Sequence, residues 1–199
     1  MMLTNNEIEQ YTVIGKMLAF HCLRGSDNNK NFYKIFRALS NDEKKRLLME
    51  IAYLRFTFII LKLNETMSDK LKLSYVEESM QDLICEKFYV NGTDDLNILL
   101  DKMYYYEEQI NNNTFGKAII KNSGIVMQKM DNEDILTSLV YFANIKELCE
   151  LNIKMIFSQD ISKLPKMYEE SKIKTRNTRI TYLVIFIFIV ILVMYFFVS

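Results

Sequence analysis

Apolar residues recur every three or four positions along most of the chain, which is the spacing of one face of an α-helix. Capping boxes, in which Ser or Thr is followed three residues later by Glu, stand before three of these periodic stretches and begin at Thr4, Ser40 and Ser74. The pattern therefore predicts one helix over about residues 5–24 and two more that begin just after Ser40 and Ser74.

The same periodicity continues through the second half of the bundle. We expect a short helix around 32–39, a helix capped by Thr93, a helix over 115–129 with Gly124 in its middle, and a last helix over 132–157 that Pro165 closes. The last helix should bury Ile135, Leu139, Phe142, Leu148, Cys149, Leu151 and Ile156. No segment alternates as a half-buried strand does, so the expected fold is all-α, a bundle of six or seven amphipathic helices.

The stretch RFTFIILKL, which begins at Arg55, is apolar on nearly every side and is broken only by Arg55 and Lys62. A helix of this kind is usually buried on several sides, so it should lie at the centre of the bundle. Its uninterrupted part, residues 56–61, is too short to span a bilayer.

Residues 180–198 differ from the rest of the chain, because fifteen of these 19 positions are Ile, Leu, Val or Phe and none is charged. As a helix rising about 1.5 Å per residue, the segment matches a hydrocarbon core of about 30 Å. Insertion is favourable by roughly 5 to 9 kcal/mol. We predict a single transmembrane helix, preferred over a buried core helix or a strand. Its representative anchor residues are Ile180, Leu183, Phe186, Phe188, Ile191 and Phe196.

Charge is distributed unevenly although the formal net charge is zero. The segment 163–179 holds six basic residues and two acidic ones, which leaves residues 1–162 with a charge of −4. The basic residues nearest the apolar segment are Lys172, Lys174, Arg176 and Arg179. They should keep the preceding domain in the cytoplasm and attract anionic membrane lipid.

This reasoning gives a single-pass, tail-anchored protein with a cytosolic bundle over 1–160, a basic juxtamembrane stalk over 161–179, a span over 180–198 and a translocated C-terminus. No signal peptide is recognisable at the N-terminus. The glycosylation patterns at Asn64, Asn91 and Asn112 should stay unmodified in this orientation. Nucleic acid is a poor partner, because the domain is acidic and the basic cluster lies against the membrane.

The sequence shows no catalytic, cofactor-binding or metal-binding pattern. His21 is the single histidine, the thiols of Cys22, Cys85 and Cys149 have no C-x-x-C spacing, and no glycine-rich phosphate loop is present. We expect His21 to cap or pack at the end of its helix and the thiols to be buried and reduced. An enzyme is not expected, although a membrane-anchored enzyme without a recognisable motif stays open as an alternative.

The octapeptide NTFGKAII, residues 113–120, resembles the aromatic-Gly-basic signature at the start of the central helix of Bcl-2-like proteins, through Phe115, Gly116 and Lys117. That family also joins a helical bundle to a C-terminal anchor. The resemblance covers four or five residues, and the polar Lys121 departs from the apolar character of that helix. It implies an apoptosis regulator with a groove near Phe115 that binds an amphipathic helix.

Among these alternatives we expect a protein-interaction or regulatory module. The helical domain would recruit an unidentified protein partner at the cytosolic face of a membrane, without a cofactor.

Overall fold

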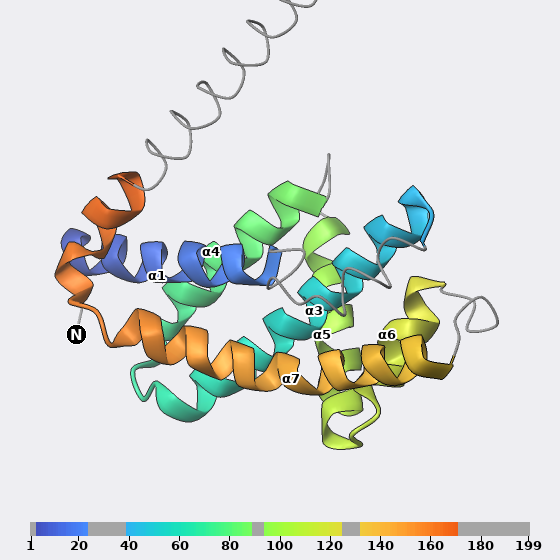
Figure 1. Ribbon diagram of the computed structural model, residues 1–199. Coiled ribbons are helices and arrows are strands. Elements are labelled where there is room, and N and C mark those ends of the chain that lie inside the picture. Colours follow the sequence, from blue (N-terminus) through green and yellow to red (C-terminus); the bar gives the residue numbers. More distant parts are fainter. Residues whose placement is uncertain (1–2, 24–38, 89–93, 125–131, 171–199) are drawn as a thin grey trace, which may run out of the picture. The chain divides into compact units, whose positions relative to one another are not determined.

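The computed structural model describes residues 3–23, 39–88, 94–124 and 132–170 of the chain (Figure 1). Its α-helices are α1 (Asn5–Leu23), α3 (Asn41–Thr66), α4 (Lys70–Phe88), α5 (Asp94–Asn111), α6 (Phe115–Ser123) and α7 (Asn132–Phe157). The described part contains no strand, so the predicted all-α fold is confirmed there. The chain divides into two compact units, Met1–Gln159 and Asp160–Ser199.

Two of the three predicted capping boxes are confirmed. The Thr4 amide donates to Glu7 Oε2 at 3.0 Å, and the Glu7 amide donates to Thr4 Oγ1 at 3.3 Å. Ser40 and Glu43 make the same reciprocal pair at 2.8 and 3.3 Å. These bonds satisfy amides that have no partner in the first turn of α1 and of α3.

The third predicted capping box is wrong, because α4 begins at Lys70. Asp69 Oδ1 accepts hydrogen bonds from the amides of Leu71 and Lys72 at 3.1 and 3.2 Å. Ser74 lies one turn inside the helix and donates to the Leu71 carbonyl at 2.8 Å. Asp caps a helix as well as Ser does, and the residues between the two are compatible with a helix, so the earlier cap is used.

The predicted helix over 115–129 is also wrong in its extent. Helix α6 ends at Ser123, and Gly124 follows in the left-handed conformation with φ 69°, its amide donating to the Lys121 carbonyl. Gly is the residue that most readily adopts this C-terminal capping conformation. The remainder of the predicted helix, residues 125–129, lies outside the described residues.

Helix α3 is the centre of the first unit, as predicted. Every residue from Ile51 to Ile60 is buried, and the helix packs against α1, α5, α6 and α7. Figure 1 shows α7 running across this helix. Burial on several sides explains why the sequence of this segment has no polar stripe.

Helices α1 and α4 form the most extensive pair in the unit. They approach so closely at Gly15 that a Cβ placed there would lie 2.0 Å from Ser79 Oγ and 2.3 Å from the Val76 carbonyl oxygen. Ser79 Oγ donates to the Thr12 carbonyl at 2.8 Å across the same contact. A residue without a side chain is therefore required at this crossing.

The second unit begins with a turn in which Asp160 Oδ1 accepts the Ser162 amide at 3.1 Å. Residues 164–170 are helical, and Pro165 lies in their first turn instead of closing α7, which ends at Phe157. Pro is tolerated there because the first amides of a helix have no intrahelical partner. None of the described helices is long and apolar enough to cross a membrane. The predicted span over 180–198 lies outside the described residues.

Candidate functional site

A buried polar cluster joins three helices around Glu50 of α3. Lys102 Nζ of α5 lies 2.6 Å from Glu50 Oε1, and Tyr106 Oη donates to Glu50 Oε2 at 2.6 Å. Asn122 of α6 adds a longer hydrogen bond of 3.3 Å to the same Oε2 atom. Both carboxylate oxygens are thus occupied.

Burial raises the pKa of the Tyr106 phenol far above its ordinary value, and the negative charge of Glu50 raises it further. The phenol therefore stays protonated at neutral pH and acts as a donor. A protonated phenol is a poor general base, and both oxygens of the Glu50 carboxylate already accept hydrogen bonds, so the cluster is suited to holding α3, α5 and α6 together. Tyr106 is buried, while Tyr104 is 63% exposed, so the tyrosine run 104–106 is divided between core and surface.

A second buried cluster lies where α1, α3 and α7 meet. Arg55 is fully buried and donates from Nη1 to the His21 carbonyl at 3.0 Å, and Cys149 Sγ lies 4.0 Å from the Arg55 carbonyl oxygen. Burial raises the pKa of the Cys22 thiol well above its usual range, and the neighbouring Cys149 adds to the shift, while Arg55 opposes it. The thiol form is favoured, so Cys22 is a poor nucleophile.

The cysteines and His21 are otherwise placed as packing residues. Cys22 and Cys149 are buried free thiols, as expected, whereas Cys85 is only half-buried. His21 is buried in the last turn of α1. No group of three or more His, Cys, Asp or Glu side chains in the described part of the chain could hold a metal ion.

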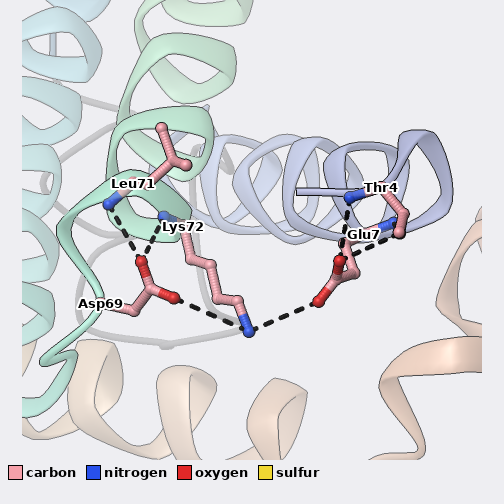
Figure 2. A network of polar contacts seen from close by, with 5 residues as sticks. All are labelled: Thr4, Glu7, Asp69, Leu71 and Lys72. Carbon is pink, nitrogen blue, oxygen red and sulfur yellow. Dashed lines mark hydrogen bonds and ion pairs between the residues drawn. The ribbon is translucent and has the colours of Figure 1, made fainter. Parts of the chain in front are cut away.

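Polar contacts also link the first turns of α1 and α4 (Figure 2). Lys72 Nζ lies 3.7 Å from Glu7 Oε1 and 3.8 Å from Asp69 Oδ2, between the carboxylates that cap the two helices. The hydrogen bonds from Thr4 lower the pKa of Glu7, and Lys72 lowers it slightly more. The pKa of Lys72 is raised, first by Tyr11, whose ring centre is 5.3 Å away, and then by Glu7.

Two of the glycosylation patterns lie at exposed residues but in different local structure. Asn64 lies in the last turn of α3, where Nδ2 donates to the Ile60 carbonyl at 3.1 Å and to Glu77 Oε1 at 3.2 Å. Asn112 is exposed in the turn that follows α5. The third pattern, at Asn91, lies outside the described residues. Of these two, Asn112 is the better placed acceptor if this domain were translocated, because it lies in a turn while the side chain of Asn64 is held in a helix.

The outer face of α7 carries large apolar side chains. Leu151 is 60% exposed, Met155 55% and Val140 51%. The prediction that Leu151 is buried is wrong, because the buried residues Ile145, Cys149 and Ile153 lie on a different side of the helix. Counting positions at the helical period from these buried residues would have placed Leu151 on another side of the helix.

The other predicted residues of this helix have mixed outcomes. Phe142, Cys149 and Ile156 are buried, as predicted, and Leu148 is half-buried. The side chains of Ile135 and Leu139 lie outside the described set.

The predicted membrane-anchor and lipid-facing residues also lie outside the described residues. They are Ile180, Leu183, Phe186, Phe188, Ile191 and Phe196 of the span and Lys172, Lys174, Arg176 and Arg179 of the stalk.

The segment that resembles Bcl-2-like proteins begins α6, a helix of nine residues. The Phe115 ring meets the Phe58 ring of α3 edge-on, with centroids 5.5 Å apart, so it packs against the central helix. The helix buried along its whole middle is α3, not α6. No protein-family model, curated protein or solved structure matches the chain.

Proposed function

We propose that the helical domain is a protein-interaction or regulatory module held at the cytosolic face of a membrane by residues 180–198. The observation that carries this proposal is the uncharged segment of 19 residues, directly preceded by a stretch with six basic residues. Favourable insertion of roughly 5 to 9 kcal/mol supports a span, and the basic residues before it support a cytosolic domain.

The described side chains support a binding role over a catalytic one. The carboxylate of Glu50 is occupied on both oxygens, and the Cys22 thiol is buried with a raised pKa. The exposed apolar side chains Leu151 and Met155 instead offer contact area on one helix. Large apolar side chains at the surface are typical of protein-interaction sites when they gather on one face.

Orientation is tested with the full chain inserted into sealed microsomes. We expect the protein to resist alkaline extraction and protease added outside to remove the helical domain. The exposed Asn112 provides a second readout, because it should carry no glycan in this orientation.

A matched control places a cleavable signal peptide before residue 1, which forces the domain into the lumen. Glycan attachment in that protein, with the loss of one glycan on Asn112→Gln, shows that this site is competent. Protection of the domain in the unmodified protein, or a glycan on its Asn112, would contradict the proposed orientation. Complete extraction at alkaline pH would contradict the anchor itself.

A further inference from the structure

The outer face of α7 combines opposite charges with an apolar centre. Glu147 and Lys154 are exposed and seven residues apart, so they lie on the same side of the helix, two turns from each other. Leu151 stands between them and is 60% exposed. Within the part of the chain that the structure describes, neither charge belongs to an ion pair.

This arrangement is complementary to itself. If two copies of α7 pack antiparallel around a two-fold axis midway between residues 147 and 154, each Glu147 faces Lys154 of the other copy. The same axis passes beside Leu151 and brings the two leucines together. A parallel pairing in register would place Glu147 against Glu147, which is repulsive, so the charges select the antiparallel direction.

We propose that the outer face of α7 binds a second copy of this chain through this antiparallel, two-fold contact. Glu147, Leu151 and Met155 form one i, i+4 row, the kind of ridge that fits the groove of a facing helix. The partner surface must carry acidic, apolar and basic side chains in the same order along a helix. A second copy of α7 has this order.

The proposal names a partner for the interaction module, and to that extent it rests on the proposed function. A two-fold axis along the membrane normal allows both copies to be anchored in one membrane from the same side. A single pair of helices buries less surface than the roughly 1,200 to 2,000 Å² of a standard stable interface. The dimer should therefore be weak in solution and favoured by confinement to a membrane, which raises the effective concentration.

The test uses the full chain labelled at its N-terminus with donor or acceptor dyes and placed in liposomes at low density. Energy transfer should be present for the unmodified protein. It should fall for Glu147→Lys alone and for Lys154→Glu alone, because each reversal turns both symmetric attractions into repulsions and should weaken association by about tenfold or more. An equal mixture of the two variants should restore energy transfer, since each supplies the charge that the other needs.

Glu78→Lys is the matched control, because Glu78 is exposed on α4 and the same reversal there should leave energy transfer unchanged. Leu151→Asp should abolish the signal by placing two carboxylates at the axis. Absence of energy transfer in the unmodified protein, insensitivity to both reversals, or a mixture that fails to recover would each overturn the proposal.

Flotation of the same liposomes keeps the two proposals separate. If the protein floats with lipid but shows no energy transfer, the dimer fails while the anchor stands. If it does not float, the anchor fails, and the same variants and mixture measured by light scattering in solution decide the dimer.

Discussion

Substitution of Gly15 by Ala should destabilise the helical domain strongly, although Ala is the better helix former. The new Cβ would lie 2.3 Å from the backbone oxygen of Val76 and 2.0 Å from Ser79 Oγ. Ser79 is buried and holds the Thr12 carbonyl at 2.8 Å, so it cannot turn away without losing that bond. Helix α4 must therefore move away from α1.

The magnitude follows from three contributions. Overpacking of a close contact costs about 1 to 3 kcal/mol, and the upper end applies because the obstacle is a backbone atom. Loss of the Ser79 hydrogen bond adds about 1 kcal/mol, and the helix propensity of Ala returns about 1 kcal/mol. The free energy of unfolding should fall by about 2 to 3 kcal/mol, which is about 1 to 2 M in the urea midpoint.

The assay is urea-dependent alkylation of Cys22 in the full-length protein, because this buried thiol in α1 becomes reactive only when α1 opens. Lys16→Ala is the matched control on the same helix, and it should leave the midpoint nearly unchanged. Adding Ser79→Ala to Gly15→Ala removes one of the two clashes and should recover less than half of the loss. A midpoint for Gly15→Ala equal to or above that of the unmodified protein would refute the close approach of α1 and α4.

Three further predictions concern the polar cluster, the cap of α1 and the span. Tyr106→Phe removes the hydroxyl that donates to buried Glu50 at 2.6 Å. The free energy of unfolding, measured by the same alkylation assay, should fall by about 1.5 to 3 kcal/mol. An unchanged urea midpoint would contradict the cluster. Because the pKa of Glu7 is lowered in the folded protein, its stabilisation is present above the unfolded pKa and lost as pH falls through the folded one. The protection of the amides in the first turn of α1, measured as their exchange rate relative to an unstructured peptide at the same pH, should therefore fall below about pH 4.5, and Glu7→Gln should remove that fall. Three lysines placed within residues 185–192 raise the free energy of membrane insertion by about 7 to 10 kcal/mol, which cancels the favourable insertion of the segment. The variant should therefore be released from membranes by alkaline extraction. Its retention in the membrane pellet would argue against a span.

The helices themselves were largely predictable from the sequence, because local signals determine them. The reciprocal bonds of Ser40 with Glu43 and the bounds of α7 agree with the pattern of caps and apolar residues. Errors arose where two local signals compete. Asp69 and Ser74 are both good caps, and Gly124 is tolerated inside a helix but preferred at its end.

The polar cluster around Glu50 was beyond sequence reasoning, since its partners are 52 to 72 positions away in the chain. A lone Glu in an amphipathic helix ordinarily indicates a solvated face, and only tertiary packing shows that it is buried. The exposure of Leu151 was missed for the opposite reason, because an apolar residue in an apolar helix was assigned to the core. Both the burial of Glu50 and the exposure of Leu151 depend on which side of a helix faces its neighbours.

The pairing of α1 with α4 has a consequence for synthesis on the ribosome. Helix α1 is complete at Leu23, but its principal partner ends only at Phe88, so roughly 65 further residues must be translated first. At about 5 to 20 residues per second this takes roughly 3 to 13 s, during which the apolar side of the nascent α1 lacks that partner. Helix α1 thus emerges before α4 but is packed only after it, and in that interval it is a natural binding site for chaperones that act on nascent chains.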